Sequence, residues 1–160
     1  MQERLRNKQK VMVALKSIDC VVGLMDLACR VAKGMNAELI TLHVTEIPAA
    51  LDLSADSAIL DSPGNEILAC AREAACREFG EISTQLIRAR QAAQTIVSEA
   101  EEQHVQLLIL GYRHKNPLAE ILSGSTVQYV ARHAPCRVIV EILPLPNFRH
   151  SESEMADLTV

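Results

Sequence analysis

The sequence predicts one α/β domain built on a parallel sheet of five strands. Short apolar segments alternate along the chain with longer segments whose apolar residues recur every three to four positions. The first pattern is typical of strands buried on both faces, and the second of amphipathic helices that join parallel strands by right-handed crossovers. A chain of 160 residues fits one such domain. We therefore expect a doubly wound sheet with helices on both faces.

Five segments have the composition of buried parallel strands. Each is short, is rich in Val, Ile and Leu, and precedes or follows a segment with helical periodicity. The predicted strands, in chain order, are 11–15, 38–44, 83–88, 105–110 and 136–142.

Four segments between the strands are predicted helices. We expect the first to end at Gly34 as its C-cap, and the second to run from Ser62 as N-cap, with Pro63 in the first turn, to a stop at Gly80. The inward-facing apolar stripes of the four helices fall within 24–32, 67–79, 93–100 and 127–131.

The ends of the chain differ in composition from its centre. Residues 1–8 form a polar extension, residues 9–143 the predicted domain, and residues 144–160 a Pro-, Ser- and acid-containing tail that we expect to be disordered. Within the domain the one long connection is 46–61, which is either a mobile surface excursion or a flap over a ligand site.

Composition excludes several classes of function. A net charge of −4, with two Tyr, two Phe and no Trp, argues against general nucleic-acid binding. No apolar run could span a bilayer and the N-terminus lacks signal-peptide features, so we expect a cytoplasmic protein without membrane insertion. Five cysteines without a C-x-x-C pair predict reduced, mostly buried thiols, and five histidines without ligand spacing predict no metal site.

The segment after the fourth predicted strand has the features of an anion site. Gly111 follows the strand directly, and Gly124-Ser125-Thr126 opens the next helix. The free N–H groups and positive dipole end of a helix N-terminus attract anions, and glycine lets the backbone approach a phosphate closely. The spacing matches neither G-x-G-x-x-G nor G-x-x-x-x-G-K-[ST], which excludes the dinucleotide and Walker A loops.

This segment resembles the nucleotide loop of the universal stress protein family. Gly111-x2-His114-x9-Gly124-Ser125 is similar to the G-x2-G-x9-G-[S/T] pattern of that family, with His114 in place of its second glycine. The resemblance extends over residues 9–143. It implies a Rossmann-like fold of strand order 3-2-1-4-5 and a ligand crevice between the first and fourth strands.

The resemblance also implies a ligand and a set of site residues. The expected ligand is ATP, or AMP or ADP, with Mg²⁺ as an expected companion. The base would pair with the backbone of Val44 at the end of the second strand, and the phosphates would lie in the glycine loop. The site residues so implied are Ala14, Leu15, Lys16, Val44, Gly111, Arg113, His114, Gly124, Ser125 and Thr126.

Two of these residues depart from the family pattern. Lys16 stands where the family often has an acidic residue near the ribose, so it is either a solvated strand-end lysine or a group that approaches a phosphate. His114 replaces a glycine, and a positive φ there would cost a histidine roughly 1 kcal/mol. It either strains the loop or forms a basic rim with Arg113 and Lys115.

The sequence favours binding over turnover. No nucleophile–base pair or carboxylate pair can be placed near the loop from spacing, so we expect no enzyme, or at most slow ATP hydrolysis or self-phosphorylation. The expected function is a nucleotide-occupied regulatory domain that forms a homodimer through strand 136–142. Two alternatives are a nucleotide-free dimeric interaction module and a regulatory domain, associated with a membrane transporter, that senses AMP or a cyclic dinucleotide.

Overall fold

The computed structural model describes residues 8–54, 58–113 and 125–143, apart from the side chains of Cys76, Glu78 and Ser125. The predicted tail 144–160 and residues 1–7 of the N-terminal extension lie outside these ranges.

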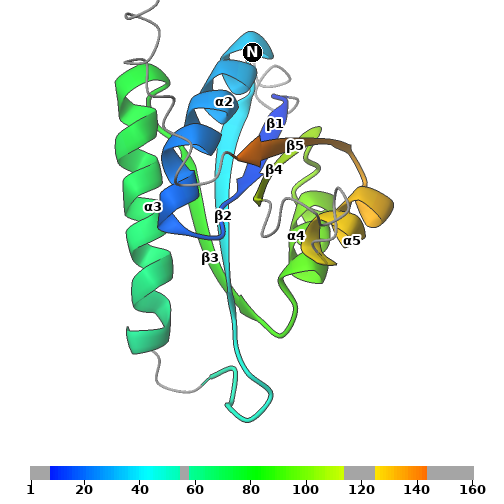
Figure 1. The fold of residues 1–160 in the computed structure, drawn as a ribbon. Helices are drawn as coiled ribbons and strands as arrows, with labels where there is room; N and C mark the ends of the chain where they lie inside the picture. Colours follow the sequence, from blue (N-terminus) through cyan, green and yellow to red (C-terminus); the bar gives the residue numbers. More distant parts are fainter. Residues whose placement is uncertain (1–7, 55–57, 114–124, 144–160) are drawn as a thin grey trace, which may run out of the picture.

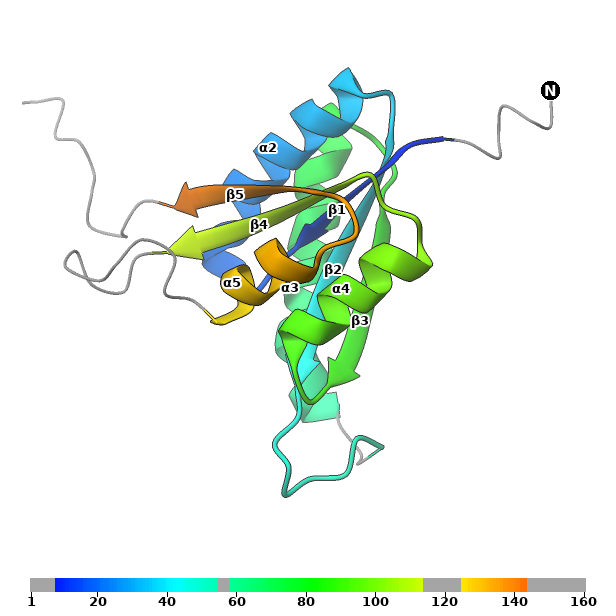
Figure 2. The same ribbon diagram turned by 90° about the vertical axis from the view of Figure 1, so that its right-hand side faces the viewer.

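Five parallel strands form one sheet in the order β3-β2-β1-β4-β5, which confirms both the predicted fold class and the predicted strand order. Helices α2 and α3 cover one face of the sheet, and α4 and α5 cover the other (Figures 1 and 2). The strands are β1 (Lys10–Ala14), β2 (Glu38–Glu46), β3 (Ser83–Ala89), β4 (Leu107–Arg113) and β5 (Arg137–Leu143). The helices are the short 3-10 turn η1 (Ile18–Cys20), α2 (Val21–Gly34), α3 (Ala58–Glu78), α4 (Ala92–Glu102) and α5 (Ser125–His133).

Alternate residues of each strand enter two separate core layers. On β1, Val11 and Val13 face α2 and α3, whereas Met12 faces α4 and α5. All three are completely buried, as expected for a central parallel strand covered on both sides. The sheet therefore buries apolar side chains on both faces, which explains why its strands lack an alternating polar pattern.

Strand β4 is longer at its carboxyl end than the sequence indicated. Gly111 and Arg113 were expected in the loop after a strand ending at 110, but both lie within β4. Pairing with β5 continues through Gly111↔Glu141 and Arg113↔Leu143, and these ladder hydrogen bonds hold the segment extended. The prediction of the boundary was wrong because β5, far along the chain, sets the strand length.

The start of α3 also differs from expectation. Helix α3 begins at Ala58, so Ser62 is not its N-cap and Pro63 lies inside it, where the ring removes one backbone hydrogen bond. The ion pair between Asp61 in its first turn and Arg88 of β3, 2.5 Å long, fastens this early turn to the sheet.

The end of α2 differs from expectation, because its C-cap is Met35 and not Gly34, whereas the end of α3 is as predicted. Gly34 is still helical, and Asn36 takes the left-handed conformation with φ 50°. Gly80 has φ +108° and donates its N–H to the carbonyl of Ala75, which confirms it as the stop of α3.

Two arginines at the end of β3 hold the connection between β2 and α3. The guanidinium of Arg90 donates to the carbonyls of Ile47 at 3.1 Å and Leu51 at 2.8 Å, and that of Arg88 donates to the carbonyl of Leu53 at 3.3 Å. The described part of this connection, 47–54, therefore packs along the β3 side of the sheet.

A buried histidine fixes the carboxyl end of β1. His43 of β2 is 8% exposed, and its Nδ1 donates to the carbonyl of Leu15 at 2.8 Å. Gly64 of α3 leaves the space for this ring: a Cβ at Gly64 would lie 2.6 Å from Cδ2 of His43 and 2.7 Å from Cδ1 of Leu86. Helix α3 can therefore approach β2 closely only because residue 64 has no side chain.

We expect Gly64→Ala to destabilise the fold by about 1–3 kcal/mol, because the overlap with the His43 ring outweighs the gain in helix propensity. Gly34→Ala is the matched control, since nothing lies within 4 Å of a Cβ at that helical glycine. It should stabilise by about 0.5–1 kcal/mol. Urea unfolding of both variants measures the effect, and equal stabilities would contradict the close packing.

Candidate functional site

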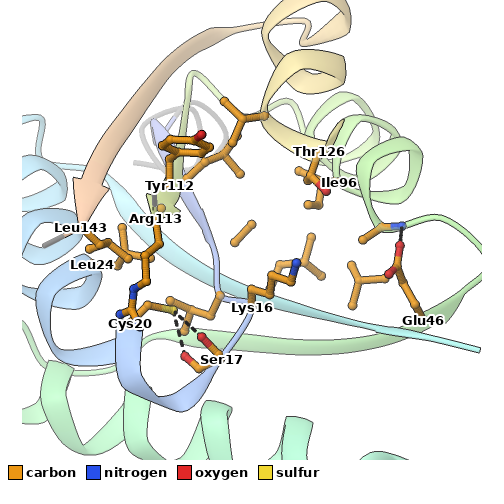
Figure 3. A pocket seen from close by; sticks show the side chains of 18 residues that line it. Lys16, Ser17, Cys20, Leu24, Glu46, Ile96, Tyr112, Arg113, Thr126 and Leu143 are labelled. Carbon is orange, nitrogen blue, oxygen red and sulfur yellow. Dashed lines mark hydrogen bonds between the residues drawn. The ribbon is translucent and has the colours of Figure 1, made fainter. Parts of the chain in front are cut away.

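A cavity of about 560 Å³ opens at the carboxyl ends of β1 and β4 (Figure 3), and the next helices of these two strands, α2 and α5, cover opposite faces of the sheet (Figure 1). Ligands of doubly wound sheets bind at such switch points. The structure brings seven of the predicted site residues into its lining, namely Ala14, Leu15, Lys16, Val44, Gly111, Arg113 and Thr126.

The remaining three predicted residues belong to the glycine loop. His114 and Gly124 lie outside the described residues. Ser125 is the first residue of α5, and its side chain is not described. Thr126 follows it in the first turn, so the N-terminal end of α5 borders the cavity.

One wall of the cavity is apolar. Val44 of β2, Ile96 of α4 and Tyr112 of β4 line it together with Val127 of α5. Ile96, Tyr112 and Val127 are buried in the core layer beneath α4 and α5. A planar group such as a base could pack against this apolar surface and displace water from it.

Sequence reasoning missed several lining residues. Glu46 extends a strand that is longer than predicted, whereas Ala92 and Ile96 come from α4, which no local pattern connects to the cavity. The rule that ligands bind at strand ends could have found Glu46. Only the packing of α4 against the sheet reveals the others.

Glu46 acts as a cap for α4. Its Oε1 accepts the backbone N–H of Ala92 at 2.9 Å (Figure 3), while the N-cap residue Gln91 provides no side-chain hydrogen bond. A carboxylate at a helix N-terminus is favourable because it meets unpaired N–H groups and the positive dipole end. The one carboxylate among the described lining residues is thus already engaged.

Arg113 forms an ion pair across the mouth of the cavity. Its guanidinium contacts the carboxylate of Asp19 in η1, and the two side chains are 31% and 49% exposed. The hydroxyl of Ser17 is the main cause that lowers the pKa of Asp19; slight burial opposes it, and Arg113 lowers the pKa further. The pair connects η1, which follows β1, to the last residue of β4.

Lys16 is the other cation of the lining. It follows β1, is exposed, and forms no ion pair with any side chain that the structure describes. Figure 3 shows its side chain extending into the open part of the cavity, between the Cys20 side and the Glu46 side. The cavity therefore presents one engaged and one unengaged positive charge.

The cysteines have roles in packing. Cys20, Cys29, Cys70 and Cys136 take part in no disulfide among the described residues. Sγ of Cys20, which lines the cavity, donates to the carbonyl of Ser17 at 2.8 Å. Burial raises the pKa of Cys136, which keeps that thiol protonated and poorly nucleophilic.

Neither a metal-binding cluster nor a membrane-spanning helix is present in residues 8–54, 58–113 and 125–143. Nowhere in them do three His, Cys, Asp or Glu side chains gather closely enough to hold a metal ion. None of the helices in the same ranges combines the length and apolar character needed to cross a bilayer.

The fold and cavity define a doubly wound α/β domain with a cavity at its switch point. Residues 8–140 match the universal stress protein family, and the chain belongs to that family. It is 27% identical over 139 residues to a universal stress protein of Methanocaldococcus jannaschii, covering 82% of this chain and 81% of the relative. It is 28% identical over 145 residues to the universal stress protein YxiE of Bacillus subtilis, covering 82% and 97%.

Solved structures share the fold. The universal stress protein UspA of Lactobacillus plantarum superposes with a TM-score of 0.68 at 25% identity, covering 84% of this chain and 98% of that one. A universal stress protein in complex with cAMP gives 0.65 at 23%, covering 83% and 95%. One from Archaeoglobus fulgidus in complex with dAMP gives 0.65 at 18%, covering 84% and 97%.

We expect both neighbours of Asp19 to hold its carboxyl group in the ionised form. Because the Ser17 hydroxyl, the largest cause, and the Arg113 guanidinium both lower the pKa of Asp19, Ser17→Ala and Arg113→Gln should each raise it. Carbon-13 NMR titration of the Asp19 carboxyl measures this, with Arg132→Gln on the exposed side of α5 as control. An Asp19 pKa that neither substitution moves would show that the contacts are absent in solution.

Proposed function

We propose that this domain binds an adenine nucleotide, ATP with a divalent ion, and that occupancy of the site serves as a regulatory signal. The observation that carries the proposal is the meeting of residues from β1, β2, β4 and α5 in one cavity. Family members solved with cAMP and dAMP support an adenine nucleotide as the ligand class.

The order of the strands suggests how the ligand lies. A base against Val44 and the apolar wall would stand over β2, and phosphates near Gly111 and the first turn of α5 would stand over β4. Strand β1 lies between them, so the ribose would pass over its carboxyl end. The helix N-terminus and Arg113 favour negative charge at the phosphate end.

The residues fit a metal that arrives with the nucleotide. Mg²⁺ at phosphate sites takes phosphate oxygens and keeps several waters, with few protein ligands. Glu46 is the one carboxylate of the described lining, and one of its two oxygens accepts the N–H of Ala92, so the lining offers few oxygen ligands to a metal. The divalent ion would therefore neutralise phosphate charge without requiring a protein site of its own.

The same lining supports binding rather than rapid hydrolysis. An efficient ATPase positions the attacking water with a base and neutralises the charge that develops in transfer. Glu46, the one carboxylate in the described lining, instead caps α4. Slow hydrolysis or self-phosphorylation is a secondary expectation.

We expect ATP to bind at micromolar to sub-millimolar affinity and Gly124→Val to abolish binding, because a side chain at that loop glycine would fill space next to the phosphates. Calorimetry with ATP, ADP and AMP in the presence of Mg²⁺ measures this, and Gly34→Ala serves as the glycine control. The proposal is wrong if the wild-type protein gives no heat with any of the three nucleotides. A Gly124→Val variant that binds like wild type would instead remove the loop from the site.

We further propose a homodimer through β5. This strand is an edge of the sheet, and Ile142 on it is 54% exposed. An edge strand presents unpaired N–H and C=O groups that a second edge can satisfy. One carboxylate oxygen of Glu141 is also buried without a hydrogen bond from the described residues, which is costly unless a donor reaches it.

The charges on β5 select one antiparallel register. If two copies pair their β5 strands antiparallel about a two-fold axis, the two sheets become one. Residues directly opposite each other in the two strands then lie on the same face of that sheet. A two-fold axis at Ile139 sets Arg137 opposite Glu141 of the second copy, twice by symmetry. An axis at Glu141 would oppose the two carboxylates, and an axis at Val138 would leave both charges without partners. Cross-strand pairing of opposite charges thus favours the register centred on Ile139.

We expect Arg137→Glu to weaken the dimer by about tenfold or more, because two cross-strand charge pairs become repulsive. The charge-swapped variant Arg137→Glu with Glu141→Arg should restore it. Light scattering over a concentration series measures both, with Arg132→Glu as control. A wild-type mass of 17.6 kDa at high concentration would refute the dimer, and a swapped variant as weak as Arg137→Glu would refute the register.

A further inference from the structure

Lys16 lines the cavity without an ion-pair partner among the described side chains. Of the two cations in the described lining, Arg113 is engaged by Asp19 while Lys16 forms no ion pair with a described residue. Glu46 faces the same cavity but accepts a hydrogen bond from Ala92. Lys16 is therefore the cation of the described lining that no carboxylate pairs with directly.

The sheet order assigns this charge to the middle of the ligand. Neighbouring strands lie roughly 4.8 Å apart, so Val44 on β2 and Gly111 on β4, with β1 between them, are separated by about 10 Å across the sheet. A nucleotide whose base lies at Val44 and whose 5′-phosphate lies at Gly111 therefore has its ribose over β1. Lys16 is the first cation beyond the end of that strand.

The backbone around Lys16 has little freedom to move it elsewhere. The N–H of Leu15 donates to the carbonyl of Leu42 at 2.9 Å, and the carbonyl of Leu15 accepts Nδ1 of His43 at 2.8 Å. Leu15 itself is 2% exposed. Residue 16 therefore leaves the sheet from a fixed point beside the ribose position.

Ribose hydroxyl groups are a poor partner for an ammonium group. A site that reads the 2′-hydroxyl commonly uses a carboxylate, which accepts the hydroxyl proton, whereas a basic residue at such a place accommodates a phosphate on that hydroxyl. Lysine has three donors, no acceptor and a full charge, so it matches phosphate oxygens better than hydroxyls.

We propose that Lys16 selects adenine nucleotides that carry a second phosphate on the ribose, at the 2′- or 3′-hydroxyl, in addition to the 5′-phosphate. The inference rests on the proposed nucleotide site and specifies its ligand class. Lys16 acts as a specificity-determining residue: it contacts the ribose phosphate, while the base and the 5′-phosphate are bound by other groups.

The test compares nucleotides that differ only in the ribose phosphate. Calorimetry at constant ionic strength measures the affinities of AMP, adenosine 2′,5′-bisphosphate and adenosine 3′,5′-bisphosphate. The wild-type protein should bind one bisphosphate about tenfold or more tightly than AMP, the gain typical of a hydrogen bond between charged groups. Lys16→Met should lose that preference, because the bisphosphate loses a direct contact while AMP loses only the long-range attraction of the charge, so the bisphosphate should weaken by about tenfold more than AMP.

Two further variants separate charge from structure. Lys16→Arg should keep most of the preference, because it keeps the charge. Lys33→Met removes an exposed lysine in the last turn of α2, outside the cavity lining, and should leave all affinities unchanged. Both substitutions are at exposed positions, so loss of folding does not obscure the result.

The outcomes are distinct. If Lys16→Met weakens AMP and ATP as much as the bisphosphates, Lys16 contacts the 5′-phosphates and the inference is wrong. If the wild-type protein binds AMP or ATP but shows no preference for either bisphosphate, the inference fails while the proposed function stands. If none of these nucleotides binds, the proposed function itself fails and the inference with it.

Discussion

The position of β1 between β2 and β4 is the constraint on which the rest of the molecule depends. Both neighbours pair with it in parallel, and its side chains fill both core layers. The helix after β1, α2, covers one face of the sheet, and the helix after β4, α5, covers the other (Figure 1). A space therefore stays open between the carboxyl ends of the two strands. The cavity is therefore a consequence of the strand order and needs no specialised element to form it.

A small set of contacts gives this cavity its chemical character. His43, held beneath Gly64, fixes the carbonyl of Leu15 and thereby the point from which Lys16 extends. Glu46 accepts a hydrogen bond from the first residue of α4, and Arg113 forms an ion pair with Asp19 across the mouth of the cavity. The Asp19–Arg113 pair is substantially exposed, so a ligand phosphate can compete for Arg113 at small cost. Lys16 is thus the cation of the described lining that is not paired with another side chain.

The long connection after β2 shows how a loop can be ordered without forming a core. Arg88 and Arg90 donate to backbone carbonyls of 47–53, and Arg88 also pairs with Asp61 of α3. Backbone carbonyls that would otherwise need water are satisfied by charged donors. Within its described part, 47–54, this connection contributes nothing to the cavity lining, which favours a surface excursion over a flap there.

The sequence by itself determined the five strands, the four long helices and the fold class, because burial on both faces and helical periodicity are local patterns. The resemblance carried by Gly111, Gly124 and Ser125 added the strand order and the family. Only the tertiary structure decided where β4 ends, since its last residues are held by pairing with β5, and where α3 begins, since Asp61 is held by Arg88. It also decided that α4 contributes to the cavity and that Arg113, unlike Lys16, is paired with a carboxylate. These features rest on contacts between residues far apart in the chain, which no local pattern encodes.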